Sequence, residues 1–269
     1  HTLVARRYDM KLGIVGKGGV GKTTVSALIA EAFAARGKRV VAIDTDSNPN
    51  LGVSLGLAAS DAEAVPVVPR SVAAGPGAGL DGGELLARYG KETPAGVTLL
   101  SAMRIDQAGA GCTCGSHAAV RSMLRDVLDD EADVTIVDME AGLEHLSRSG
   151  GTLAYADVLL MVMEPSRKSV LTAARTVALA DELGIPRCLG VGNKARLPDD
   201  AAFFAEACAE HGVEVAAVIP LDAAIPAADR AGTGVVGIGG GAARTAVNQL
   251  VDRLEAQPLQ ARVAPMPAR

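Results

Sequence analysis

The chain contains no tryptophan and few other aromatic side chains, with three tyrosines and three phenylalanines among its 269 residues. Apolar residues still make up 49% of the sequence, so its core must consist mainly of aliphatic side chains. Such a core is typical of a parallel sheet covered by helices. The shortage of aromatic rings removes the platforms on which single-stranded nucleic acids stack. The net charge of −5 disfavours a broad phosphate-binding surface, so we expect no nucleic-acid partner.

Long apolar runs are missing as well. The longest strand-like run, at 157–165, is far shorter than the roughly 20 residues that a membrane-spanning helix needs. Residues 1–9 contain no apolar segment typical of export signals, and we expect Met10 to be the natural start. The sequence therefore predicts a cytoplasmic protein with no membrane partner. We expect residues 1–9 to be disordered or foreign to the natural chain, and the tail 256–269 to be disordered.

Strand-like and helix-like patterns alternate along most of the sequence. Apolar runs predict strands at 11–15, 39–44, 97–101, 133–138, 157–163, 187–192 and 213–220. Apolar residues at helical spacing predict helices at 22–36, 117–129, 168–184, 199–211 and 242–255. This alternation indicates an α/β fold. We expect a single doubly wound, mainly parallel sheet flanked by helices over 10–255.

Residues 57–96 interrupt this alternation. The stretch is rich in glycine, proline and alanine, and only 82–89 has a helical pattern. An insertion of this length is often a mobile functional loop or a flap that contacts a partner. A solvated elaboration without a function of its own is the alternative. We expect 57–96 to be flexible.

A glycine-rich stretch, GKGGVGKTT, follows the first expected strand and begins the first expected helix. It matches the phosphate-loop pattern G-x-x-x-x-G-K-[ST] in the context that this pattern requires. In such a loop the backbone N–H groups bind phosphate oxygens at a helix N-terminus. Lys22 is expected to contact the β- and γ-phosphates of ATP, Thr23 to bind Mg²⁺, and Thr24 to contact the α-phosphate. The expected nucleotide-binding residues are Gly16, Lys17, Gly18, Gly19, Val20, Gly21, Lys22, Thr23 and Thr24.

With its extra lysine, Lys17, this stretch resembles the deviant Walker A motif of the MinD, ParA, nitrogenase iron protein and arsenite ATPase class. The resemblance implies a P-loop ATPase in which Lys17 crosses a dimer interface to the partner's nucleotide, in the manner of an arginine finger. The stretch AIDTDSNPN at 42–50 resembles switch I of the class. That resemblance implies that Asp44 lies near Mg²⁺ and that Asp46 orients the attacking water.

Three further stretches resemble parts of the same class. VDMEAG at 137–142 resembles switch II, which implies that Asp138 holds the water shell of the metal. GNK and IPLD resemble the strand end and the loop that recognise the base, and the residues implied there are Asn193, Lys194, Pro220 and Asp222. The resemblance thus gives catalytic roles to Lys17, Lys22, Asp46 and Asp138.

Cys112 and Cys114 lie in a polar, glycine-rich stretch, whereas Cys188 and Cys208 lie in apolar patterns typical of inert core thiols. In a reducing compartment a CxC pair is expected to bind a metal or to carry out redox chemistry. A disulfide between positions i and i+2 would close a small strained ring. One chain offers two thiolates, too few for a closed site. Two chains related by a two-fold axis offer four, which suits tetrahedral Zn²⁺ or square-planar Ni²⁺.

The stretch GCTCGS and the later DMEAGLEHLSRSG resemble the CooC-type ATPases, which help to insert nickel into carbon monoxide dehydrogenase. The resemblance implies an ATP-hydrolysing metallochaperone. ATP would close a homodimer, the four cysteines would capture Ni²⁺ or Zn²⁺, and hydrolysis would release the metal to a client metalloenzyme such as carbon monoxide dehydrogenase. A redox or persulfide role for the cysteine pair, or no role, stays open. Switch I departs from the expected pattern, because it reads Asp-Ser-Asn-Pro-Asn instead of Asp-Pro-Asn-Ala-Asn.

A partitioning or positioning ATPase of the MinD/ParA type, without a metal role, is the main alternative. MinD-like proteins need a basic amphipathic C-terminal helix, and 242–261 has few large apolar residues and no basic cluster. An electron-transfer ATPase with an iron–sulfur cluster between its subunits is a second alternative. Two histidines also have open roles. His117 is either an accessory metal ligand or a residue at a helix start, and His145 is either a ligand or an ordinary interface side chain.

Overall fold

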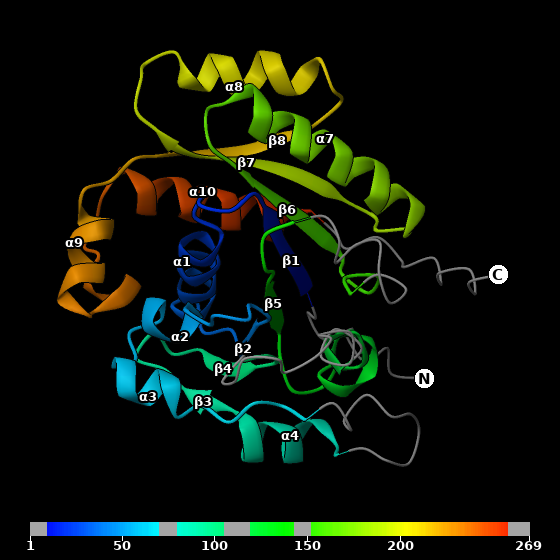
Figure 1. Cartoon of the computed structure of the whole chain (residues 1–269), viewed down its shortest axis with the longest axis vertical. Coiled ribbons are helices and arrows are strands. Elements are labelled where there is room, and N and C mark those ends of the chain that lie inside the picture. Colours follow the sequence, from blue (N-terminus) through cyan, green and yellow to red (C-terminus); the bar gives the residue numbers. More distant parts are fainter. Residues whose placement is uncertain (1–9, 70–79, 105–118, 143–151, 258–269) are drawn as a thin grey trace.

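A single sheet of eight strands organises the molecule (Figure 1). The computed structural model describes residues 10–69, 80–104, 119–142 and 152–257. The strands are β1 (Met10–Gly16), β2 (Val40–Asp44), β3 (Lys91–Glu92), β4 (Thr98–Ser101), β5 (Val134–Asp138), β6 (Val158–Met163), β7 (Cys188–Ala195) and β8 (Val215–Pro220). Their order across the sheet is β3-β4-β2-β5-β1-β6-β7-β8. Every neighbouring pair is parallel except β3 and β4.

Helices cover both faces of the sheet, which confirms the predicted doubly wound fold (Figure 1). Helices α1 (Lys22–Ala34) and α10 (Ala242–Ala256) pack on one face, and α7 (Arg167–Glu182) and α8 (Asp200–Ala209) pack on the other. The two buried clusters between these layers are almost entirely aliphatic, as the composition predicts. The shorter elements are α2 (Leu51–Ser54), α3 (Ala59–Glu63), α4 (Gly82–Tyr89), the π-helical turn η2 (Met123–Val127), α9 (Ala224–Ala231) and the 3-10 turn η3 (Gly234–Gly237).

The predicted strands and long helices are present, and the differences lie in the short elements. The expected helix at 82–89 coincides with α4, whose N-cap Asp81 accepts a 2.8 Å hydrogen bond from the Glu84 N–H. The expected helix at 117–129 is described from residue 119 and continues as the π-helical turn η2. Helices α2 and α3 were not predicted, because each is too short for a repeating apolar pattern. Helix α9 was not predicted either, and Ala228 is its one buried residue.

Several expectations concern segments outside the described residues. Residues 1–9, 70–79 and 258–269 belong to this group, so the expectations of disorder at the two ends and of flexibility in 57–96 stay predictions. The described parts of 57–96 carry α3, α4 and β3. Among the described residues, no helix combines the length and the apolar character that crossing a bilayer requires.

Of the two cysteines outside the CxC motif, Cys208 is placed as expected for a core thiol, whereas Cys188 is only partly buried against the core. Cys208 is fully buried on α8, and its Sγ lies 4.0 Å from Sδ of Met163. Cys188 is half-buried at the start of β7, and burial raises the pKa of its thiol to about 12. A thiol with so high a pKa is almost never a thiolate at neutral pH, so it is a poor nucleophile and metal ligand.

Strand β1 is the point where the strand order changes side, because β2 to β5 lie on one side of it and β6 to β8 on the other. Strand β1 pairs with β5 on one side and with β6 on the other. In an open parallel sheet, the carboxyl ends of the strands at such a switch point form a crevice where ligands bind. The phosphate loop follows β1, and switch I and switch II follow β2 and β5, so this topology brings the three stretches together.

Lys11 is a charged residue on β1, an interior strand of the sheet. Its side chain is fully buried, and its Nζ donates to the Leu124 carbonyl at 2.5 Å and forms an ion pair with Asp129. Its backbone N–H donates to the Asp157 carboxylate at 2.8 Å. The acidic stretch at 125–133 has the sequence pattern of a helix end and turn with a solvated face. The structure corrects this expectation in part, because the Asp129 carboxylate is half-exposed and turns toward a buried ammonium group.

We expect Lys11→Ala to lower the free energy of unfolding by about 3 kcal/mol, because it removes a fully buried side chain and leaves a cavity. Lys11→Met is the matched control, since it fills the same space without a charge, and we expect it to cost about 1 kcal/mol or less. Urea unfolding measures both values. Equal losses for the two variants would show that the ammonium group itself contributes to stability beyond its volume.

Candidate nucleotide-binding site

The phosphate loop joins the end of β1 to the start of α1. Gly16 and Gly21 have φ values of 152° and 94°, a region of backbone conformation that favours glycine. A Cβ at Gly16 would collide with the Val162 carbonyl oxygen of β6, and one at Gly21 would lie 2.6 Å from Nδ2 of Asn193. Gly18 and Gly19 are exposed, and among the described residues nothing lies within 4 Å of a Cβ added at Gly19. The loop is therefore packed tightly at its two ends and open at its tip, where phosphate oxygens would lie.

Lys22 lies folded against this loop. Its side chain is buried, and its Nζ donates to the Lys17 carbonyl at 3.2 Å. Burial lowers the pKa of Lys22, while the charges of Asp138, Asp46 and Glu140 oppose this shift. The ammonium group thus lies among three carboxylates, and a bound triphosphate would offer it a second set of oxygens. Lys17 is half-buried at the loop's start.

Two carboxylates end neighbouring strands beside the loop. Asp44 on β2 and Asp138 on β5 are register partners, and both are buried. Burial raises the pKa of Asp44 to about 6, although the N–H groups of Leu51 and Asp46 donate to its oxygens. Burial, and then the charge of Asp44, raise the pKa of Asp138 to about 7. Hydrogen bonds from Thr23 and Ser26 and the charge of Lys22 only partly offset this rise.

These residues fit a magnesium ion. Two buried carboxylates side by side need a cation, as their raised pKa values indicate, and Mg²⁺ binds oxygen ligands. The Thr23 hydroxyl faces Asp138 and supplies a third oxygen. Within the described parts of the chain, no three His, Cys, Asp or Glu side chains gather into a metal-binding group. The set found here is instead two carboxylates and one hydroxyl, which suits an ion that keeps several waters and also binds phosphate oxygens.

Asp46 begins the switch I loop, one residue beyond Thr45. Its backbone N–H donates to Oδ1 of Asp44 at 3.0 Å, and its own Oδ1 accepts the Asn48 N–H at 2.9 Å. Thr45 donates through both its N–H and its hydroxyl to the Asp138 carbonyl, at 3.1 and 2.9 Å. Switch I is therefore fixed to the ends of both β2 and β5. The structure brings Asp46 into electrostatic reach of Lys22.

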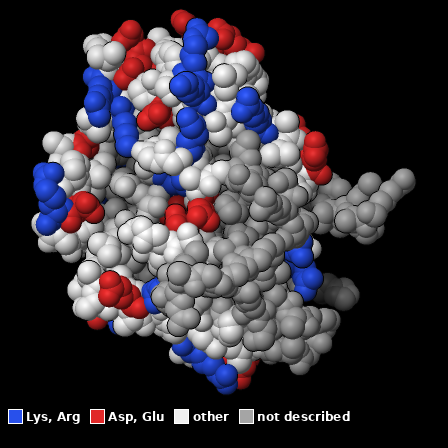
Figure 2. Space-filling model, in the orientation of Figure 1, with Lys and Arg blue, Asp and Glu red and all other residues white. Residues whose placement is uncertain are grey.

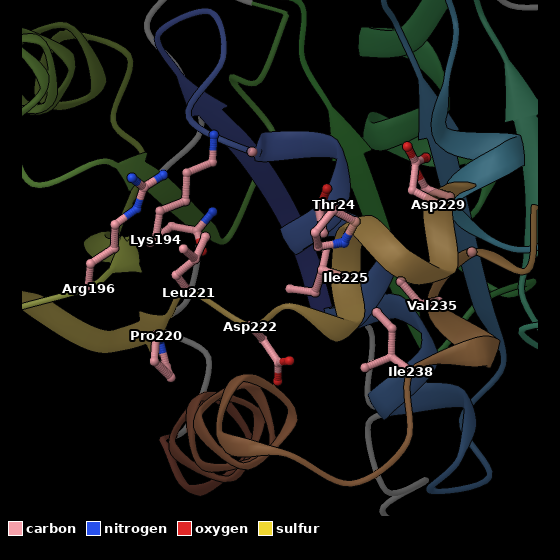
Figure 3. Close-up of a pocket in the computed structure, with 15 residues that line it drawn as sticks. Thr24, Lys194, Arg196, Pro220, Leu221, Asp222, Ile225, Asp229, Val235 and Ile238 are labelled. Carbon is pink, nitrogen blue, oxygen red and sulfur yellow. The ribbon is translucent and has the colours of Figure 1, made fainter. Parts of the chain in front are cut away.

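A cleft of about 360 Å³ adjoins the phosphate loop (Figure 3). It brings together six of the residues predicted from sequence, namely Gly21, Thr24, Asn193, Lys194, Pro220 and Asp222. Figure 3 shows Lys194, Arg196 and Leu221 on one side of the cleft and Ile225, Val235 and Ile238 on the other. Its mixed polar and aliphatic walls suit a nucleoside. Sequence patterns missed the second wall, because α9 and η3 match no motif and reach the cleft only through the fold.

Two of the predicted base-recognition residues also support the phosphate loop. The side-chain amide of Asn193 donates to the Val20 carbonyl at 2.8 Å, and Lys194 donates through Nζ to the Gly19 carbonyl. Lys194 has a φ of 58°, a left-handed conformation uncommon for a residue other than glycine. Asp222 accepts the Ala224 N–H at 2.9 Å at the start of α9. The structure thus adds a structural task to Asn193 and Lys194, whose predicted contact with the base stays a prediction.

The predicted cargo-metal ligands Cys112 and Cys114 lie outside the described residues, as do His117 and His145. Their assignment therefore stays a prediction. Glu140 of switch II is described and half-buried, and its Oε1 accepts a 3.0 Å hydrogen bond from the Ser47 hydroxyl. Sequence reasoning did not anticipate this contact between the two switches.

Comparisons with known proteins agree with this site. The family model of the CobQ/CobB/MinD/ParA nucleotide-binding domain matches residues 14–235. The carbon monoxide dehydrogenase accessory protein CooC of Rhodospirillum rubrum is 37% identical over 237 residues, which span 83% of this chain and 88% of that protein. A ParA family ATPase from Chlorobium tepidum is similar with a TM-score of 0.73 at 19% identity, covering 92% of this chain and 99% of that one. The septum site-determining protein MinD of Pyrococcus horikoshii, solved with Mg-ADP, has a TM-score of 0.68 at 22% identity, covering 92% and 96%. At these identities the two solved structures establish the fold alone.

We expect the nucleotide-free protein to lose stability as the pH rises from 5 to 8. Asp44 and Asp138 have pKa values of about 6 and 7 in the folded state, well above the ordinary value of an aspartate. The folded state therefore binds more protons than the unfolded state below pH 7, and the stability that this supplies is lost as the pH rises through the folded pKa values. Urea unfolding at several pH values, with EDTA present, measures the trend.

Asp138→Asn is the informative variant for this trend, because its Oδ1 can still accept the Ser26 hydroxyl but cannot ionise. We expect a smaller decline in stability with pH for this variant than for the natural chain. An identical decline in both proteins would refute the raised pKa of Asp138.

Proposed function

The chain belongs to the CobQ/CobB/MinD/ParA nucleotide-binding domain family and is a P-loop ATPase of that family, and we propose that it works as an ATP-driven metallochaperone. In this proposal, ATP closes a homodimer, the dimer carries Ni²⁺ or Zn²⁺ on paired cysteines, and hydrolysis releases the metal to a client metalloenzyme. We propose that it acts in the cytoplasm. The observation that carries the proposal is the CxC motif at 112–114, in a chain whose similarity to a CooC protein spans 83% of its length.

The described residues support specific roles in the ATPase cycle. The backbone N–H groups of the phosphate loop and Lys22 would bind the phosphates, and Asp222 and Pro220 would border the base. Mg²⁺, held by Thr23 and by waters on Asp44 and Asp138, would neutralise phosphate charge. Asp46 would orient the attacking water, in the position that switch I gives it beside Asp44. Lys17 would reach the partner's nucleotide and stabilise the charge that develops during transfer.

The metal is the cargo in this proposal, and the chemistry of thiolates supports it. Each chain has one CxC pair, and the remaining two cysteines are half-buried or buried, with raised pKa values. Four thiolates from two copies would complete a coordination sphere that one copy cannot provide. The relative in Rhodospirillum rubrum is named as an accessory protein of carbon monoxide dehydrogenase, so an enzyme of that kind is the client that we propose.

The MinD/ParA type of positioning ATPase is the second candidate, since solved structures of that type share the fold. Two observations on the described residues disfavour it. The apolar residues of α10, including Val247, Leu250 and Leu254, are buried within the molecule, so this helix has no apolar face left for a membrane. On the one side of the molecule that Figure 2 displays, acidic residues lie among the basic residues of the described part, whereas DNA binding favours a continuous basic surface.

We expect the Cys112→Ser, Cys114→Ser double variant to lose Ni²⁺ and Zn²⁺ binding while it keeps its affinity for ADP. The natural chain should hold about one metal ion for every two chains when a non-hydrolysable ATP analogue is present. Metal analysis after gel filtration, together with the mass in solution, measures both quantities. The matched control is the Cys188→Ser, Cys208→Ser double variant, which should bind metal like the natural chain. Equal metal content in both double variants would exclude the CxC motif as the metal site.

We expect Lys17→Ala to lower the rate of ATP hydrolysis about a thousandfold, because it removes the charge proposed to act across the dimer. Its affinity for ADP should stay within about twofold of the natural value, since Lys22 supplies the contact within the chain. Lys38→Ala, beyond the far end of α1, is the control and should hydrolyse ATP normally. Normal turnover by the Lys17 variant would contradict the role across the dimer.

A further inference from the structure

Switch I and switch II are joined by a hydrogen bond between two side chains. The Ser47 hydroxyl donates to Oε1 of Glu140 at 3.0 Å, and both residues are half-buried. Ser47 stands at the position where the sequence departs from the expected switch I pattern, which has proline there. A proline side chain has no donor, so it could not make this bond. The hydrogen bond therefore depends on Ser47, the residue at which this chain differs from the switch I pattern that it resembles.

The rest of the switch I loop is arranged around the carboxylate of Asp44. The Asp46 N–H donates to one oxygen of Asp44 and the Leu51 N–H donates to the other, at 3.0 and 2.9 Å. These two bonds hold both ends of the loop. Ser47 follows Asp46 directly, so a bond from its side chain to Glu140 limits how far the intervening loop, and Asp46 with it, can turn.

Glu140 also lies in the electrostatic environment of the phosphate site. Its charge acts on the ammonium group of Lys22, together with the charges of Asp138 and Asp46. A γ-phosphate would add negative charge to this same place. The Ser47 hydroxyl gives the Glu140 carboxylate a donor, and hydrogen bonds to ionised groups are the stronger kind. The bond thus connects Glu140 on switch II to the residue that follows Asp46 on switch I.

We propose that Ser47 is a positioning residue for ATP hydrolysis, and that it acts by holding Glu140 against switch I so that Asp46 keeps its orientation toward the attacking water. The bond acts on turnover, since neither Ser47 nor Glu140 lines the nucleoside cleft. This role of Ser47 rests on the role proposed for Asp46 in ATP hydrolysis and does not depend on the proposed metal cargo. Loss of metal binding and loss of this coupling are therefore separate results.

Steady-state ATP hydrolysis by four variants tests the proposal. We expect Ser47→Ala and Glu140→Ala each to lower kcat about tenfold, a change of about 1.4 kcal/mol in the barrier. The KM for ATP should stay within about twofold. The double variant should be no slower than either single variant, because the two substitutions remove the same bond. Ser47→Thr keeps a hydroxyl and should restore most of the natural kcat.

Ser60→Ala, on the exposed helix α3, is the matched control and should leave both kcat and KM unchanged. The proposal is overturned if the effects of Ser47→Ala and Glu140→Ala multiply in the double variant, which would show that the residues act independently. It is equally overturned if Ser47→Ala leaves kcat unchanged, or if Ser47→Thr is as slow as Ser47→Ala.

Discussion

The arrangement of this molecule depends on two carboxylates that are buried side by side at the ends of neighbouring strands. Asp44 and Asp138 occupy partner positions in the parallel pairing of β2 and β5. Burial raises the pKa of each, and the charge of Asp44 adds to the rise at Asp138. Such a pair is unfavourable without a cation. We interpret the pair as a site whose negative charge is neutralised by a bound cation. The phosphate loop, where the phosphates of a nucleotide would bind, lies beside it.

Nearby cationic and hydrogen-bond donor groups partly stabilise the negative charge of these two carboxylates. Lys22 and the hydroxyls of Thr23 and Ser26 act on Asp138, and backbone N–H groups from switch I act on Asp44. Because Asp44 accepts hydrogen bonds from the switch I backbone, a change in its charge would change the strength of the bonds that hold Asp46 and Leu51. The contact between Ser47 and Glu140 extends this linkage to switch II. Short, specific contacts therefore connect the two buried carboxylates with both switches.

Much of the fold and part of the site could be predicted from sequence, for identifiable reasons. Strands with apolar runs and helices with a regular apolar face carry a local signal, as does a phosphate loop whose glycines and lysine stand at fixed spacing. The buried pairing of Lys11 with Asp129 has no such signal, because its partners lie 118 residues apart. The wall of the cleft built by Ile225, Val235 and Ile238 is equally hidden, since those residues meet only in the folded chain. The hydrogen bond from the Asn193 amide to the Val20 carbonyl joins residues 173 positions apart in the sequence, and it was missed for the same reason.

Proton release on nucleotide binding tests the central claim most directly. Binding of Mg·ADP at pH 6.5 is measured by calorimetry in two buffers that differ in ionisation enthalpy, with ADP in EDTA as the reference. If Asp138 and Asp44 are partly protonated before the cation binds, Mg·ADP should release about one proton per chain. ADP alone should release clearly less. Equal binding heats in the two buffers, showing no release of protons, would contradict the account.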